Sequence, residues 1–288
     1  MKVQAVISLK AGHRLGLLLE AAGLARSTFF YHQGRLALPD PQTGLKAAIH
    51  AAFNTAKGRY GHRRVHRELV KAGWQVAKKT VLKLMRQSGL FSHVRRRRRY
   101  NSFQGEAGQA APNLLDRDFN AGEPNEKWVT DVTEFRIGES KIYLSPVMDL
   151  FDRSILAYSW GTSPGLQLTN TPLQEALSTL RPGEHPMVHS DQGFQYRHRS
   201  WRNLLAGAGA KQSMSRKGTC LDNAVIEGFF GHLKEELFNH ARYPSVEAFT
   251  AELDEYMHWY NNVRTHTRLE GLSPAEYRTQ ALAAYGSN

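Results

Sequence analysis

The sequence has a single cysteine, Cys220, and no long uncharged apolar run. One cysteine excludes an internal disulfide and a cysteine-rich zinc module, and it is typical of a protein from a reducing cytosol. The best apolar run near the N-terminus, Leu15–Leu19, is far shorter than the ~20 residues that span a bilayer, and no cleavage-site pattern follows it. The sequence therefore predicts neither a membrane span nor a signal peptide, and we expect a cytoplasmic location.

Acidic residues are scarce in the first part of the chain. Residues 1–120 carry 22 lysines and arginines against 6 aspartates and glutamates, whereas residues 121–288 carry 16 against 20. The positive charges in residues 1–120 repel one another. An excess of this kind is typical of a surface that binds a polyanion, because each neutralised phosphate releases a condensed counterion. The charge therefore predicts a nucleic-acid partner. The alternatives are a solvated basic face that aids solubility and, less favoured, an anionic membrane surface.

Apolar residues at helical spacing, with glycines at the helix ends, predict two small helical units in this basic part. Residues 1–38 are expected to form a helix-turn-helix-like segment that turns at Gly23. Residues 43–94 are expected to form a helical DNA-binding domain, because short helices with basic outer faces are typical of helix-turn-helix readers. Its helices are predicted over Leu45–Ala56, Arg63–Ala72 and Lys79–Gln87. Its candidate DNA contacts are Arg63, Arg64, Lys78 and Lys79.

A basic linker is predicted over residues 95–126. It begins with five consecutive arginines, which repel one another and are expected to bind DNA phosphates: Arg95, Arg96, Arg97, Arg98 and Arg99. Residues 100–126 are rich in Gly, Ala, Asn and Pro and lack periodicity, which is typical of an interdomain connector.

From residue 127 the pattern predicts an α/β domain that extends to residue 263, followed by a C-terminal tail over residues 264–288. Strands are predicted over Trp128–Phe135, Ile142–Asp149, Ile155–Trp160, Met187–Ser190 and Lys211–Met214. Helices are predicted over Thr169–Leu180, Ser200–Gly207, Asp222–Phe238 and Val246–Asn261. Three meandering strands followed by alternating helices and strands indicate a sheet with helices on its faces.

Three acidic residues fall where they can meet at one edge of that sheet. Asp131 lies in the first strand, Asp191 follows the short strand Met187–Ser190, and Glu227 lies on a helix after 35 intervening residues. Clustered carboxylates repel unless a divalent cation lies among them, and oxygen ligands favour Mg²⁺ or Mn²⁺ over zinc. Two such ions ~4 Å apart serve phosphodiester chemistry. For each residue alone, a solvent-side acid or an Asx turn is the alternative.

Several segments carry a family resemblance. The most specific are WVTDVTEF at 128–135, HSDQGFQY at 189–196 and SMSRKGTCLDNAVIEGFF at 213–230. Further matches are WYNNVRTH at 259–266, GLSPAEY at 271–277 and, in the basic part, YGHRR at 60–64 and LMR at 84–86. Together they resemble the OrfB transposases of bacterial insertion sequences, whose catalytic domain is similar to retroviral integrase. Thr219 and Gly228 depart from the residues common in that family, and neither position is a ligand.

The resemblance implies an α/β RNase H-like, integrase-like catalytic domain preceded by an all-α helix-turn-helix DNA-binding region. It implies that Asp131, Asp191 and Glu227 are the catalytic triad and hold two Mg²⁺ ions, with Mn²⁺ able to substitute. It also implies DNA cleavage at the ends of the element, followed by attack of the freed 3′-hydroxyl on another phosphodiester. Lys234 matches a lysine expected to contact DNA, and His189 and Asn223 match positions expected to support the triad.

The implied partners are double-stranded DNA, at the terminal repeats and at the target, and further copies of this chain in a dimer or larger assembly. The product of the family's upstream reading frame is another candidate partner, and a location at the nucleoid is expected. Two alternatives stay open: a structure-selective RNase H-like endonuclease with the same metals, and a non-catalytic DNA-binding regulator.

Overall fold

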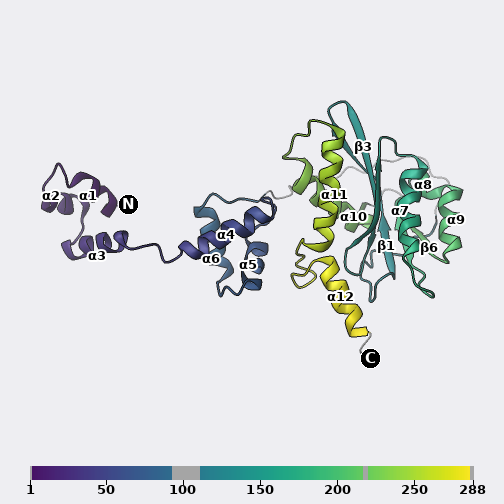
Figure 1. Cartoon of the computed structure of the whole chain (residues 1–288), viewed down its shortest axis with the longest axis horizontal. Helices are drawn as coiled ribbons and strands as arrows, with labels where there is room; N and C mark the ends of the chain where they lie inside the picture. Colours follow the sequence, from purple (N-terminus) through teal and green to yellow (C-terminus); the bar gives the residue numbers. More distant parts are fainter. Residues whose placement is uncertain (1, 93–110, 217–219, 286–288) are drawn as a thin grey trace. The chain divides into compact units, whose positions relative to one another are not determined.

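The computed structural model describes residues 2–92, 111–216 and 220–285. The chain divides into two compact units, which we call the N-terminal unit, Met1–Phe91, and the core unit, Ser92–Asn288 (Figure 1). The predicted phosphate-binding run Arg95–Arg99 lies outside the described residues. Within the described residues, no helix combines the length and the apolar character needed to cross a membrane.

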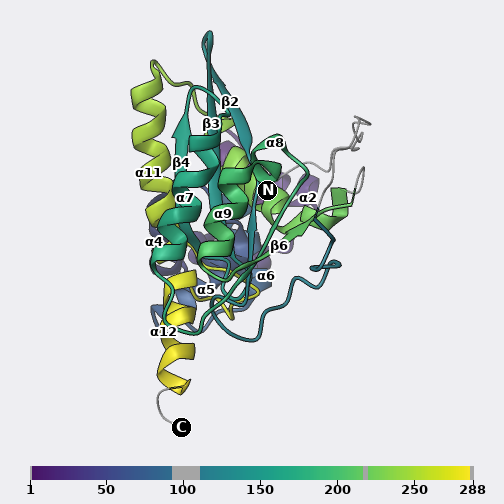
Figure 2. The same ribbon diagram turned by 90° about the vertical axis from the view of Figure 1, so that its right-hand side faces the viewer.

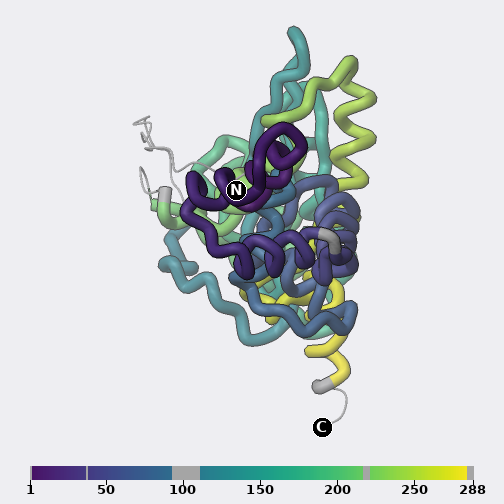
Figure 3. The backbone as a smooth tube through the Cα atoms, turned by 90° about the vertical axis from the view of Figure 1, so that its left-hand side faces the viewer, coloured from purple at the N-terminus to yellow at the C-terminus, as the bar shows by residue number. Residues whose placement is uncertain are grey.

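The N-terminal unit begins with three short helices, α1 (Lys2–Leu9), α2 (Leu15–Ala22) and α3 (Arg26–Ala37). They are the purple part of the tube in Figure 3. They enclose a small cluster of three buried side chains: Val6, Leu19 and Phe29. Gly23 ends α2 in the left-handed conformation, at φ 60°, which glycine adopts without steric cost. The turn therefore lies where the sequence predicts it, whereas α1 had no prediction.

Three further helices form the second part of the same unit: α4 (Thr43–Thr55), α5 (His62–Lys71) and α6 (Lys78–Gln87). Each contacts the other two. Their apolar stripes are buried against one another: Ile49, Val65, Leu69, Val81, Leu84 and Met85. All three lie within a few residues of the predicted helices, because an amphipathic stripe is the strongest signal that a sequence gives for a helix.

The core unit contains one mixed sheet of six strands. These are β1 (Lys127–Thr130), β2 (Thr133–Ile137), β3 (Ser140–Asp149), β4 (Ile155–Gly161), β5 (Met187–Ser190) and β6 (Lys211–Met214). The long β3 pairs antiparallel with β4 on one side and with β1 and β2 on the other. Beyond β1 lie β5 and then β6, each parallel to its neighbour. The carboxyl ends of β1 and β5 are therefore neighbours at one edge of the sheet.

One predicted strand, Trp128–Phe135, is in fact two. Thr130 pairs with Val147, and Thr133 pairs with Leu144, so the register is the same on both sides of the gap. That register puts Asp131 opposite Pro146. A proline has no N–H to donate to the ladder, so pairing stops there. The interruption occurs at the position of the first candidate catalytic residue.

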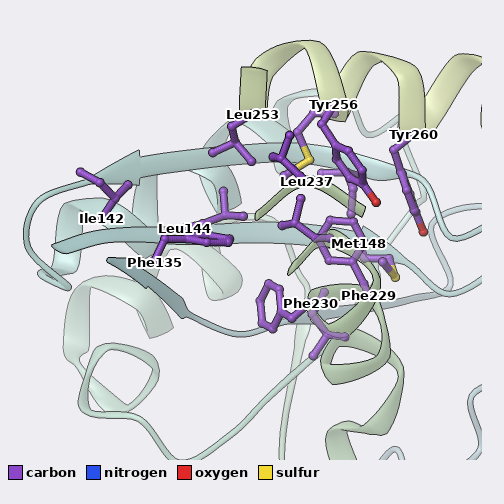
Figure 4. Packing of buried hydrophobic residues seen from close by; sticks show 14 of the residues in the cluster. Phe135, Ile142, Leu144, Met148, Phe229, Phe230, Leu237, Leu253, Tyr256 and Tyr260 are labelled. Atoms are coloured by element: carbon purple, nitrogen blue, oxygen red, sulfur yellow. The ribbon is translucent and has the colours of Figure 1, made fainter. Parts of the chain in front are cut away.

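Helices cover both faces of the sheet and make three layers. On one face, α10 (Ala224–Leu233) and α11 (Val246–Asn262) pack over the larger cluster, in which Leu253 and Tyr256 of α11 point toward the strands (Figure 4). On the other face lie α7 (Leu166–Ser178) and α9 (Arg199–Gly207), seen in front of the sheet in Figure 2. These helices cover a second cluster of buried apolar side chains, which includes the fully buried Trp201. Each sheet face is thus sealed by apolar side chains.

The predicted helix Asp222–Phe238 has three parts. A 3₁₀ turn, η1 (Cys220–Asn223), leads into α10, which continues as a π-helical segment, η2 (Lys234–Phe238). Such π segments occur often at functional sites. Here the segment begins at Lys234, a candidate DNA contact.

Two predicted boundaries need correction. The expected tail over residues 264–288 contains α12 (Pro274–Tyr285), which packs on α11 and whose Arg278 donates to Asp149 and Asp152. The expected connector up to residue 126 is packed from residue 111 onward, with Leu115 buried in the larger cluster. Both segments are held by partners more than 90 residues away in sequence, which local composition does not reveal.

Candidate active site

Asp131 and Asp191 leave the sheet at the ends of two neighbouring parallel strands. Asp131 follows β1, Asp191 follows β5, and Val129 pairs with His189 between them. In open α/β sheets, ligands bind outside the carboxyl ends of the strands. The Oδ1 atom of each carboxylate accepts a backbone N–H, from Val132 at 2.7 Å and from Gly193 at 2.8 Å.

Glu227 arrives at the same edge from the first turn of α10, which contacts β1. The start of that helix is held by Asn223, whose buried side chain donates from Nδ2 to the carbonyl oxygen of Thr130 at 3.4 Å. Thr130 is the residue before Asp131. The same amide therefore ties the helix that carries Glu227 to the strand that leads to Asp131.

The electrostatics show that these side chains share one site, which we call the carboxylate site: Asp131, Asp191 and Glu227. Burial raises the pKa of Asp131 to about 8, and the negative charges of Asp191 and Glu227 add to that rise. The positive charge of Lys234 acts in the opposite direction on the same pKa. Burial also raises the pKa of Asp191. Two acids and one lysine, up to 103 residues away in sequence, are thus within electrostatic reach of Asp131.

The donor set fits a hard divalent cation. Every candidate ligand is a carboxylate oxygen, and oxygen ligands are those that Mg²⁺ prefers. Across the described ranges, no three His, Cys, Asp or Glu side chains are already at metal-holding spacing. Two of the three carboxylates instead accept hydrogen bonds from backbone near their own position in the chain.

Comparison with known proteins identifies the family. Residues 121–220 and 227–282 each match an integrase core domain, and residues 40–99 match an HTH-like domain. A putative transposase InsK for insertion sequence element IS150, from Escherichia coli strain K12, is 46% identical over 272 residues, which cover 94% of this chain and 96% of the relative. The chain belongs to the insertion-sequence transposases. The family and the order of its parts, a helix-turn-helix region before an integrase-like core, are as the sequence predicts.

A more distant relative agrees with this family. The transposase InsF for insertion sequence IS3A, also from Escherichia coli K12, is 34% identical over 82% of this chain and 83% of its own length. Among solved structures, the catalytic core domain of HTLV-2 integrase in complex with magnesium, in a trimeric form, covers 55% of this chain and 98% of that chain. Its sequence identity is 16% and its TM-score is 0.42.

His189 of the transposase lies in β5, where it pairs with Val129 of β1, and its side chain is fully buried. Its Nδ1 atom is 2.8 Å from Oγ of Ser213, and its Nε2 atom is 3.1 Å from Oγ of Ser215. Burial lowers the pKa of His189 to about 4, so the imidazole is neutral at physiological pH. His189 therefore joins β5, which leads to Asp191, to the end of β6. A positioning task fits this geometry, as the resemblance implies for both His189 and Asn223.

Lys234 lies two helical turns after Glu227, and its Nζ atom is 5.4 Å from the centre of the Phe135 ring. A cation over an aromatic face is held in place at little cost in desolvation. The lysine thus lies within electrostatic reach of Asp131 in the carboxylate site.

Four further candidate DNA contacts belong to the N-terminal unit. Arg63, Lys78 and Lys79 are exposed, on α5 and at the start of α6. Arg64 is half-buried, with its guanidinium 5.6 Å from the centre of the Tyr60 ring. No acidic residue lies in the first turn of either helix. The starts of α5 and α6 are therefore basic, as the charge count of residues 1–120 predicts.

Sequence reasoning missed one prominent residue of the core unit, Asp222. Its carboxylate is completely buried, and it accepts hydrogen bonds from Asn113, Arg117 and Arg216. Its position between Cys220 and Asn223, in the most specific segment of the resemblance, was a signal. Its partners were not visible, because Arg117 is 105 residues away.

Proposed function

We propose that this transposase cleaves DNA at the ends of its element and joins the freed 3′-hydroxyls to target DNA. In this proposal Asp131, Asp191 and Glu227 hold two Mg²⁺ ions, and Mn²⁺ can substitute. The observation that carries the proposal is the shared electrostatics of the carboxylate site, where Asp191 and Glu227 both raise the pKa of Asp131. When bound, the ions would stabilise the charge on the attacking and leaving oxygens of a phosphodiester.

The chain's own residues would supply positioning, which dominates phosphoryl transfer. Asn223 and His189 hold the helix and the strand that carry two of the acids. Lys234, held against Phe135, would bind a DNA phosphate beside the scissile bond. The larger cluster of apolar side chains, between the sheet and α10, would exclude water from that face of the sheet.

The basic N-terminal unit would bind double-stranded DNA at the terminal repeats. Phosphate contacts from Arg63, Arg64, Lys78 and Lys79 would set its register, and a helix in the major groove would read the sequence. The arginines at positions 95–99 would add contacts to the phosphates of the DNA backbone. Two ends must be joined in one reaction, so we propose at least two copies of the chain on the DNA. The upstream-frame product is a further proposed partner.

The test uses the full chain, labelled element ends, Mg²⁺ and a target plasmid. Wild type is expected to give both cleaved ends and joined products. Asp131→Asn and Glu227→Gln are expected to lose both products while binding the ends normally. Glu134→Gln, an exposed acid on β2 paired with Lys141, is the matched control and is expected to react as wild type does.

Each alternative has its own outcome. Nicked DNA without joined products would favour the structure-selective nuclease. DNA binding by wild type without any chemistry would favour the regulator. Full activity in both Asp131→Asn and Glu227→Gln would overturn the role of the carboxylate site.

A further inference from the structure

The described structure resumes at residue 111, and the segment that follows contacts the end of β6. The amides of Leu114 and Leu115 both donate to Oγ of Ser213, at 2.9 and 3.1 Å. The amide of Met214 donates to the carbonyl of Pro112 at 3.2 Å. The end of the linker is thus fastened to the end of β6, and Ser213 is also a hydrogen-bonding partner of His189.

A group of four residues, which we call the Asp222 cluster, closes this junction: Asn113, Arg117, Arg216 and Asp222. Oδ2 of Asp222 accepts from Asn113 Nδ2 at 2.9 Å and from the backbone N and Nε of Arg216 at 3.0 and 2.9 Å. Oδ1 accepts from Nε of Arg117 at 2.8 Å and from Nη2 of Arg216 at 2.9 Å. The carboxylate is fully buried with five donors, so charge-assisted bonds satisfy both of its oxygens.

Residues next to the Asp222 cluster in sequence lie beside two acids of the carboxylate site, Asp191 and Glu227. Asp222 lies in η1, immediately before Asn223, and α10 with Glu227 begins one residue later. Ser215, next to Arg216, donates from its amide to the carbonyl of Ser190, the residue before Asp191, at 2.9 Å. Gln192, the residue after Asp191, donates to the carbonyl of Ser215 at 3.0 Å.

Two of the three residues that donate to Asp222 come from the linker side and one from the side of β6. Asn113 and Arg117 belong to the segment that follows the linker from the N-terminal unit. Arg216 belongs to the loop that leads to Glu227. A single carboxylate therefore fixes the arrival of the linker and the start of the catalytic helix by the same bonds.

We propose that Asp222 is a positioning residue that couples docking of the 111–117 segment to the placement of Glu227. This inference rests on the proposed function for its catalytic consequence only. Loss of the Asp222 charge would release Arg117 and Arg216 together, and the turn before α10 would lose its bonds to the 111–117 segment. A misplacement of about 1 Å at a reacting group costs on the order of 100-fold in rate.

The test compares Asp222→Asn with Asp152→Asn in the full chain. Asp152 is a matched control, since it is also a fully buried carboxylate that is paired with an arginine, Arg278, but it lies at the β3–β4 turn. We expect Asp222→Asn to lower the single-turnover cleavage rate at saturating DNA by about tenfold to 100-fold, with KM for DNA nearly unchanged. Asp152→Asn is expected to lower stability and to keep the wild-type rate in the folded protein.

Hydrogen exchange gives a readout that does not depend on activity. In Asp222→Asn, amides of residues 111–117 and of α10 are expected to lose protection together, and in Asp152→Asn neither segment changes. Arg117→Ala, which removes one linker-side bond, is expected to give a smaller loss in both segments.

Unchanged protection of α10 in Asp222→Asn would overturn the coupling. Where the wild type cleaves DNA, a cleavage rate of Asp222→Asn equal to that of Asp152→Asn would overturn it as well. If both segments lose protection together but wild type does not cleave DNA, the coupling stands and the proposed function falls.

Discussion

Arg264 and Glu236 form an ion pair inside the core unit, with Nη2 of the arginine 2.6 Å from Oε1 of the glutamate. The side chains are only 2% and 7% exposed. A second bond joins Arg264 Nε to Glu236 Oε2 at 2.9 Å, and the same oxygen accepts from the hydroxyl of Tyr256. The pair joins the π-helical segment that begins at Lys234 to the end of α11. Its removal is therefore a test of what fixes that segment.

We predict that Arg264→Met lowers the free energy of unfolding by about 3–5 kcal/mol, because it leaves the Glu236 charge buried without an opposite charge. Urea denaturation at neutral pH measures this loss. Lys141→Met breaks an exposed pair with Glu134 and is expected to cost less than about 1 kcal/mol. The double variant Arg264→Met with Glu236→Gln is expected to recover part of the loss. A single variant as stable as the wild type would show that the pair does not hold this segment.

Local signals in the sequence predicted much of this fold. Gly23, Gly73 and Gly89 follow helices at positive φ, and each marks a helix end that the sequence had indicated. Along β2, buried and exposed residues alternate, which is the period of a strand with one buried face. The strand positions of Asp131 and Asp191 predicted that these acids can converge at a sheet edge, and the strands that lead to them are neighbours in the sheet.

Other features depend on partners that are distant in sequence. Nothing near Asp222 reveals that Arg117 binds it, and nothing near Asp149 reveals Arg278, 129 residues away. The break in the first strand depends on Pro146, which faces Asp131 only after β3 has paired.

The missed helix α12 is a different case, because a local signal was present. Ser273 and Glu276 form a capping box, in which each side chain bonds the backbone N–H of the other, at 3.3 and 2.7 Å. Pro274, at the first helical position, strengthens that signal. The apolar residues of α12 follow no single stripe, so periodicity gave no support.

The carboxylate site predicts opposite effects of one substitution with and without Mg²⁺. Without the metal, Asp131→Asn is expected to be more stable than wild type, since the carboxylate is destabilised by burial, Asp191 and Glu227. Mg²⁺ at 100 times its Kd adds about 2.7 kcal/mol to the wild type. For a unit of this size that raises Tm by roughly 5–11 °C. Thermal unfolding with Mg²⁺ or EDTA measures both effects.

The control for this prediction is Glu134→Gln, which is expected to keep the full Mg²⁺ shift. Asp131→Asn and Glu227→Gln are expected to lose most of it. An equal shift in all variants would place the metal away from these acids.

Asp222 predicts a pH dependence of stability. Hydrogen bonds from Arg216, followed by the contribution of Arg117, hold the pKa of Asp222 well below its usual range in the folded protein. The unfolded chain, with an ordinary aspartate pKa of about 3.9, therefore takes up the proton first as pH falls. The stabilisation is complete above about pH 5 and decreases as pH falls below about 4.

The measurement is the difference in unfolding free energy between wild type and Asp222→Asn from pH 7 to pH 3, which is expected to shrink on the acid side. A constant difference would contradict this origin.

Lys78 and Lys79 predict an opposition between stability and DNA binding. Both occupy the first turn of α6, where the helix dipole is positive, so each destabilises the free protein by about 0.3–1 kcal/mol. A DNA phosphate at this helix end would reverse that effect, because both the lysines and the free N–H groups attract an anion. Replacing both with alanine is therefore expected to stabilise the free protein. It is also expected to lower the slope of log K against log salt by about 0.9 for each lost phosphate contact.

Arg202→Ala on α9 removes the same kind of charge from the core unit and is expected to leave the slope unchanged. Fluorescence anisotropy with a labelled element end at several salt concentrations gives the slopes. A double alanine variant with the wild-type slope would show that this helix end does not contact DNA.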